Sequence, residues 1–198
     1  GEESGANKHL RSTAFEMSLF GTGVMKGPFA IDKEYPNWDA EGKYDPTFKT
    51  TPQISHVSVW NFYPDPDSTN IDQAQYVIER HKMSRTELRS LKRRPFFREN
   101  VIESVIMDGE NYVKKYWEDD LTDYNQENYV ERFEVFEYWG MMDTAMLQEQ
   151  DVDIPKELQD FDELQANIWV CGGKVLRAVL NPFKPAKIPY MAAPYELN

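Results

Sequence analysis

Cysteine is almost absent from this chain, since Cys171 is the only one among 198 residues. An internal disulfide framework is therefore excluded, which is typical of proteins made in a reducing compartment. The N-terminal residues carry no secretory or transit pattern, so we expect synthesis in the cytosol. Lys174 is the only nearby basic residue in sequence that can lower the pKa of Cys171, which favours a buried, inert thiol over a nucleophile.

Histidine is scarce as well, and this limits the metal sites that the chain can build. His9, His56 and His81 are the only three, and none has a second ligand type at metal spacing on its own expected element. We assign them structural or surface roles. The sequence therefore predicts no catalytic, cofactor-binding or metal-ligating residue on this ground, and no cofactor.

Long apolar runs and an excess of positive charge are also missing. No segment approaches the roughly 18–20 apolar residues that cross a bilayer, so no membrane partner is expected. With 34 acidic against 22 basic residues the formal charge is −12, which repels phosphate backbones and argues against sequence-specific DNA binding. One basic stretch stands apart and is suited to an acidic neighbour or, as a weaker option, a host-directed interaction: Lys82, Arg85, Arg89, Lys92, Arg93, Arg94 and Arg98.

Apolar and aromatic residues are abundant by contrast. A 40% hydrophobic content with 14% aromatics is enough for a core in a chain of this length. Aromatics and methionine are also favoured at interface centres, so we expect neighbouring subunits to cover some of them. Because the chain begins at Gly1 without an initiator Met and stops at Asn198 without a cap, we expect an internal fragment of a longer polypeptide.

The patterns predict an α+β fold of helices with antiparallel hairpins and a meander. We treat residues 1–198 as a single segment with two sub-parts, a helix and strand mixture over 1–128 and a meander with a proline-rich extended end over 129–198. In the first sub-part we expect, in order, a helix at 2–20, a kinked strand or strand pair at 23–31, a turn-rich excursion at 32–52, a strand at 54–60, a turn at 64–67, a strand at 75–83, a helix at 84–94, and short helices at 100–107 and 110–116.

The helix at 84–94 has the clearest start and stop. Ser84 and Glu87 have capping-box spacing, and Pro95 ends the helix. In the second sub-part, 129–139 is rich in aromatic and β-branched residues and predicts a strand. An acidic insertion at 141–162 follows, and then two strands at 166–170 and 175–180 flank a Gly172-Gly173 turn, while residues 181–195 are expected to be extended.

Three motifs approach a chemical signature without completing it. Gly21-Thr22-Gly23 follows an expected helix and lacks the Gly-Lys-Ser/Thr order of a phosphate loop. Asp65, Asp67 and Asn70 begin like a calcium loop, yet the central glycine is absent and Tyr76 stands where a glutamate belongs, which favours a solvated Pro-Asp turn.

The third motif is a set of carboxylates, Glu131, Glu134 and Glu137, along the strand expected at 129–139. We interpret them as a solvated strand face. The alternative function is a small acidic hydrolase or ligand-binding domain that uses these residues with His56 or His81, and it predicts perturbed carboxylate pKa values in a concave site.

The order of several short segments resembles the portal proteins of tailed bacteriophages, in particular those of podovirus-like phages. The resemblance extends over most of the chain and is carried by 18–26 (SLFGTGVMK), 52–66 (PQISHVSVWNFYPDP), 76–80 (YVIER) with 84–88 (SRTEL), 134–140 (EVFEYWG), 175–178 (VLRA), 181–183 (NPF), 189–190 (PY) and 194–195 (PY).

The resemblance implies a structural subunit without enzymatic activity. Portal subunits form a ring, dodecameric in the virion, at one capsid vertex, through which DNA passes during packaging and ejection without sequence-specific binding. The implied partners are other copies of the chain, the major capsid protein, the terminase that hydrolyses ATP, and tail or adaptor proteins. The segment resembles the wing region, reaching toward the clip, and the implied location is the virion portal vertex after synthesis in the host cytoplasm.

Overall fold

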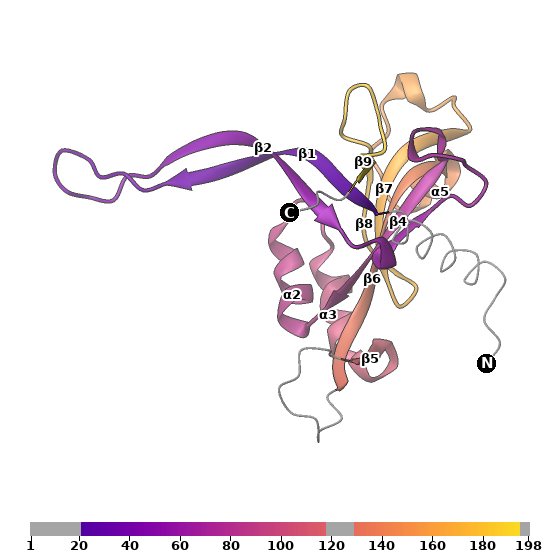
Figure 1. Ribbon diagram of the computed structural model, residues 1–198, viewed down its shortest axis with the longest axis horizontal. Helices are drawn as coiled ribbons and strands as arrows, with labels where there is room; N and C mark the ends of the chain where they lie inside the picture. Colours follow the sequence, from indigo (N-terminus) through magenta and orange to yellow (C-terminus); the bar gives the residue numbers. More distant parts are fainter. Residues whose placement is uncertain (1–20, 118–128, 195–198) are drawn as a thin grey trace. The chain divides into compact units, whose positions relative to one another are not determined.

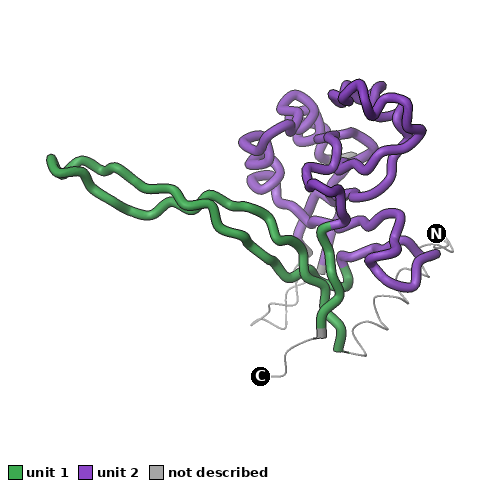
Figure 2. The backbone as a smooth tube through the Cα atoms, turned by 90° about the horizontal axis from the view of Figure 1, so that it is seen from above, with its two compact units in different colours: residues 1–60, 189–198 green, residues 61–188 purple. Residues whose placement is uncertain are grey.

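The computed structural model describes residues 21–117 and 129–194, and these form two compact units (Figure 2). Unit 1 comprises the described residues up to 60 together with 189–194, and unit 2 comprises those between 61 and 188. Antiparallel sheet dominates both, and helices occur in unit 2, so the expected α+β class is confirmed. The helix expected at 2–20 lies outside the described residues.

Unit 1 is a three-stranded antiparallel sheet with the order β2-β1-β9. Its strands are β1 (Thr22–Tyr35), β2 (Thr47–Val57) and β9 (Tyr190–Pro194). In the part of the chain that the structure describes, strand β9 pairs with Thr22–Lys26 of β1. Beyond a bulge between Lys26 and Phe29, β1 and β2 pair with each other alone, from Phe29 opposite Gln53 to Tyr35 opposite Thr47. We call residues 29–53 the arm; it is part of the long pair of antiparallel chain segments that Figure 2 draws as a green tube.

The sequence pattern predicts the first part of β1 correctly, but it does not predict how far the two strands of the arm extend. The kinked strand expected at 23–31 is confirmed, with the kink at Gly27, whose φ is 125°. The turn-rich excursion expected at 32–52 is wrong at both ends, because only residues 36–46 leave the strands. Polar cross-strand pairs extend the ladder on either side; for example, Thr50 Oγ1 donates to Asp32 Oδ1 at 2.6 Å.

Unit 2 is built on a six-stranded antiparallel sheet with the order β3-β4-β6-β7-β8, with β5 also paired to β6 (Figure 1). Its strands are β3 (Phe62–Pro64), β4 (Tyr76–Met83), β5 (Val113–Trp117), β6 (Tyr129–Asp143), β7 (Glu163–Cys171) and β8 (Lys174–Leu180). The meander expected from residue 129 onward corresponds to β6, β7 and β8 and is confirmed. The strand expected at 75–83 is β4.

Each face of this sheet has its own core, because successive strand residues point to opposite sides. On one face lie helices α2 (Arg85–Ser90), α3 (Glu99–Met107) and α4 (Gly109–Tyr112). They contribute to a core that contains Leu88, Leu91, Phe97, Ile102, Val105, Ile106, Phe133, Val135, Trp169, Cys171 and Leu176. The second core lies beside α5 (Thr144–Glu149) and contains Leu147, Ile154, Leu164, Ala166 and Ile168.

The helices expected at 84–94, 100–107 and 110–116, which fall within the described residues, are confirmed except at one boundary. Ser84 and Glu87 form the expected capping box, and the last turn of the segment tightens to a 3₁₀ turn at Leu91–Arg93 before Pro95. Short 3₁₀ turns also occur at Val59–Asn61, Ile71–Gln73 and Lys156–Leu158. The helix expected at 110–116 is wrong beyond Tyr112, because residues 113–117 pair with β6 as strand β5. No helix among the described residues is long and apolar enough to span a membrane.

The Gly172-Gly173 turn joins β7 to β8 with φ values of 58° and 76°, as the hairpin prediction requires. A Cβ at Gly172 lies 2.1 Å from the Tyr112 ring, whereas nothing lies within 4 Å of a Cβ at Gly173. We therefore expect Gly173→Ala to lower the free energy of unfolding by about 1 kcal/mol through backbone strain. Gly172→Ala adds a steric cost of about 1–3 kcal/mol. Urea unfolding measures both, and equal losses contradict the Tyr112 contact.

Candidate functional site

Three ionisable side chains from two adjacent strands meet on one face of the unit 2 sheet. Glu79 lies directly opposite Glu137 in the register of β4 and β6, and His81 follows Glu79 by two residues. Because strand side chains alternate with a period of two, all three point to the same side. Glu137 is 2% exposed and Glu79 9%, so this group is embedded in the fold.

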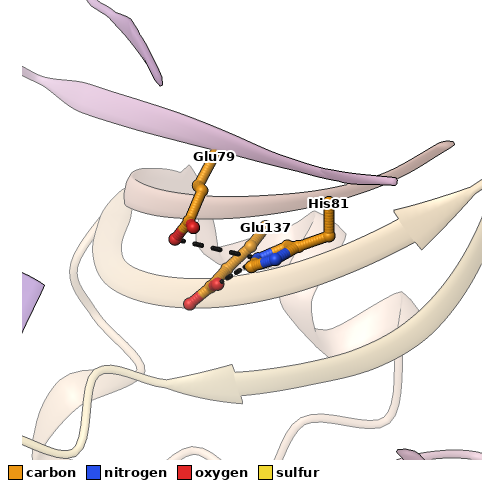
Figure 3. A group of neighbouring side chains, drawn as sticks. All are labelled: Glu79, His81 and Glu137. Atoms are coloured by element: carbon orange, nitrogen blue, oxygen red, sulfur yellow. Dashed lines mark hydrogen bonds and ion pairs between the residues drawn. The ribbon is translucent and has the colours of Figure 1, made fainter. Parts of the chain in front are cut away.

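The carboxylates of Glu79 and Glu137 both point toward the imidazole of His81 (Figure 3). His81 Nε2 lies 2.9 Å from Glu137 Oε1 and 3.7 Å from Glu79 Oε1. All three donor atoms lie within 4.8 Å of one another. We call Glu79, His81 and Glu137 the Glu-His-Glu cluster. It can share a proton between imidazole and carboxylate or hold a cation.

Two tryptophans fix the orientation of the cluster. Trp139 Nε1 donates a hydrogen bond of 2.6 Å to Glu137 Oε2, the carboxylate oxygen that does not face His81. The His81 ring stacks on Trp169 with a centroid distance of 5.0 Å and an interplanar angle of 10°. The positions of the carboxylate and imidazole are therefore set by groups that pack within the same sheet.

A buried polar network continues from the cluster toward β8. Asn167 Oδ1 accepts from Trp169 Nε1 at 3.1 Å and also from Arg177, whose Nε donates to the carbonyl of Pro95 at 3.1 Å. Burial lowers the pKa of Arg177, the nearby charge of Arg94 lowers it further, and the negative charge of Glu137 opposes both. The guanidinium is thus a cation within reach of the Glu137 carboxylate.

The structure groups only part of the residue set that the hydrolase hypothesis requires. It brings Glu137 and His81 together, but Glu131 is exposed and Glu134 points to the opposite face of β6. His56 is exposed on β2 and belongs to unit 1. Sequence reasoning missed Glu79, although its two-residue spacing from His81 within an expected strand was a usable signal.

The solvated strand face expected for the three glutamates is wrong for two of them. Glu137 is buried, and Glu134 is half-buried among cationic and phenolic groups. Tyr116 Oη donates to Glu134 Oε2 at 2.6 Å, Lys114 Nζ donates to Glu134 Oε1 at 3.0 Å, and Arg80 Nη1 lies 3.6 Å away. Glu134 lies between aromatic residues on its strand, which favour burial. Its carboxylate is stable in this half-buried position because hydrogen-bond donors face it.

Burial alone raises the pKa of Glu134. Hydrogen bonds from Tyr116 and Lys114, with the charges of Lys114 and Arg80, outweigh burial and hold this pKa below its ordinary value. Burial raises the pKa of Tyr116, and the hydrogen bond from Tyr116 to Glu134 raises it further.

The other near-motifs have structural roles. Asp65 accepts from the amides of Asp67 at 3.0 Å and Gln75 at 3.1 Å, which confirms the Pro-Asp turn. The expectation that this turn is solvated is wrong for Asp65, which is only 7% exposed because these backbone amides face its carboxylate. Thr22 and Gly23 lie in β1 and pair with β9, which is extended backbone and not a phosphate loop.

The basic stretch binds largely to its own chain. Lys92 and Arg89 both reach Glu103 on α3, the latter at 3.7 Å. Arg98 Nη1 donates to Gln150 Oε1 at 2.8 Å, and Arg94 lies over the Trp169 ring at 5.1 Å. The acidic neighbour expected for this stretch is in part Glu103.

Neither a scan against models of known protein families nor a search of curated proteins gave a match to this chain.

The half-buried carboxylate of Glu134 predicts a pH-dependent stability difference. Its pKa is lower in the folded state than the ordinary 4.5, so its contribution is complete above that value and disappears as the pH falls through the folded-state pKa. We expect Glu134→Gln to cost about 1 kcal/mol at neutral pH and progressively less below about pH 4. Urea unfolding across pH measures this, with exposed Glu131→Gln as the control. A constant difference between wild type and Glu134→Gln contradicts the assignment.

The Cys171 thiol is 1% exposed, and burial raises its pKa to about 11, with a smaller contribution from the charge of Glu134. The expected buried thiol is confirmed. We expect alkylation of the folded protein at pH 8 to be at least about 100-fold slower than in denaturant, because thiolate and access are both scarce. Mass spectrometry of labelled samples measures the two rates, and similar rates contradict the burial of Cys171.

Proposed function

We propose that this chain is a non-catalytic structural subunit of a viral portal ring, which forms a DNA channel and connects the capsid to the tail. The proposal is supported by the ordered resemblance of the segments at 18–26, 52–66, 76–88 and 134–195 to portal proteins. It is also supported by one structural observation that stands apart from any resemblance, which is the exposure of the arm.

The arm has no hydrophobic core of its own. None of residues 29–53 is buried, although several of its side chains are large and apolar. Phe48 is 64% exposed, Trp38 59% and Tyr44 53%. The ring contact between Trp38 and Tyr44, at 5.7 Å, and the hydrogen bond from Tyr44 to Glu34 organise only the tip.

An isolated two-stranded ribbon is marginally stable in water. Within residues 21–117 and 129–194, no third strand pairs with the arm beyond Lys26, so β1 and β2 are both edge strands there, and edge strands are templates for pairing with another chain. Exposed aromatic residues on such a ribbon are suited to the centre of a protein interface. A closed ring of identical subunits provides a neighbour on each side of every copy and therefore a partner for each arm.

The charge of the chain agrees with a channel that conducts DNA without binding it. A net charge of −12 repels the phosphate backbone, so DNA that passes close to such subunits is not retained. In the proposed role the ring lies at the portal vertex of the virion, where the capsid protein, terminase and tail or adaptor proteins contact it.

The oligomeric state of the intact protein tests the proposal directly. We expect mass photometry to give one high-mass species near twelve subunits, and negative-stain images to show a ring with a central hole. A compact monomer that turns over a substrate through His81 and Glu137 contradicts the proposal and favours the hydrolase alternative.

A single substitution in the arm tests whether the arm contributes to the ring. Phe48 is exposed, so Phe48→Asp leaves the subunit folded but places a charge in the proposed interface. We expect the subunit concentration needed for ring formation to rise at least about tenfold, which corresponds to about 1.4 kcal/mol per contact. Phe161→Asp, at a 56% exposed position in unit 2, is the matched control. Equal effects of both substitutions, or none, contradict a role for the arm.

A further inference from the structure

We propose that the Glu-His-Glu cluster binds a divalent first-row transition ion, with Zn²⁺ as the representative, through Glu79 Oε1, His81 Nε2 and Glu137 Oε1. The site is independent of the portal proposal, because it lies within unit 2 and involves no arm residue. An ion there joins β4 to β6 directly.

The spacing of the donor atoms suits such an ion. Bonds from Zn²⁺ to imidazole nitrogen and carboxylate oxygen are about 2.0–2.2 Å, so two ligand atoms on one ion lie roughly 3–3.5 Å apart. The two measured separations from His81 Nε2, 2.9 Å and 3.7 Å, lie on either side of this range. The three ligand atoms all lie within 4.8 Å of one another, so the two carboxylates have to turn toward each other for all three atoms to bind one ion; Figure 3 shows the three side chains gathered around the His81 ring.

Two neighbouring tryptophans orient the cluster, as hydrogen-bonding and packing groups do around metal ligands. The 2.6 Å hydrogen bond from Trp139 occupies Glu137 Oε2, which leaves Oε1 as the oxygen facing His81. Stacking on Trp169 holds the His81 ring so that Nε2 faces both carboxylates. The ligands are therefore oriented before an ion arrives, which lowers the entropic cost of binding.

The ligand set also indicates which ion binds. Two carboxylates and one imidazole favour zinc, cobalt or manganese, whereas calcium and magnesium prefer oxygen ligands alone. Three protein ligands leave a coordination position for water, as in open zinc sites. The His81 side chain is 23% exposed and that of Glu79 12%, so an ion can enter from the His81 side, while Glu137 at 2% forms the base.

The competing explanation is an ion pair between His81 and Glu137, which needs no metal. The two explanations differ in the response to added ions. A shared proton leaves stability unchanged when Zn²⁺ is added, whereas an ion that binds only the folded state stabilises it by mass action.

The test is thermal unfolding of the intact protein after treatment with a chelator, with and without Zn²⁺. At a Zn²⁺ concentration 100-fold above Kd we expect Tm to rise by about 5–10 °C. Titration with Co²⁺ is expected to give the visible absorption bands of a nitrogen- and oxygen-ligated ion at one equivalent. No shift in Tm and no cobalt bands in the wild-type protein overturn the proposal, as does an equal shift with Mg²⁺ or Ca²⁺.

Variants assign the ion to this cluster. Glu79→Gln and His81→Gln keep side-chain size and are expected to weaken Zn²⁺ binding at least tenfold, measured by calorimetry. His56→Ala removes an exposed histidine of unit 1, and Glu134→Gln removes a carboxylate from the other face of β6, so both are expected to bind as the wild type does. Glu79→Gln is the decisive variant because, of these substitutions, it disturbs the folded core least. If Glu79→Gln binds Zn²⁺ with wild-type affinity, the assignment is overturned.

Discussion

Strand β6 is the element on which unit 2 depends, because it pairs with β4, β5 and β7. Its odd-numbered residues supply Phe133, Val135, Glu137 and Trp139 to one face, and all four are buried. A carboxylate in the middle of such a row is costly to desolvate unless donors meet it. Trp139 and His81 meet it here, so the β4–β6 register and the burial of Glu137 depend on each other.

The two faces of β6 also differ in the groups that surround their glutamates. The face that carries Glu137 places its carboxylate beside Trp139 and His81, whereas the opposite face places Glu134 beside Tyr116, Lys114 and Arg80. The first carboxylate is embedded and oriented, and the second is balanced by cations near solvent. Two glutamates three residues apart therefore have different partners and different surroundings.

Local signals made much of the fold predictable from the sequence. The capping box at Ser84, the Gly172-Gly173 turn and the aromatic run from Tyr129 are encoded by neighbouring residues, and each gave the correct element. Strand β5 was not predictable in this way, because residues 113–117 become a strand only by pairing with β6. The Glu-His-Glu cluster depends likewise on the register between β4 and β6, which joins residues 79 and 137 across a long sequence separation.

The pairing of β9 with β1 has a consequence for the order in which the protein folds during synthesis. Residues 190–194 complete the sheet of unit 1 only after all of unit 2 has left the ribosome, because unit 2 is inserted between residues 60 and 189. The long sequence separation makes this closure slow relative to the local hairpins of unit 2. Translation therefore delays the last strand at the base of the arm until the inserted unit is able to fold.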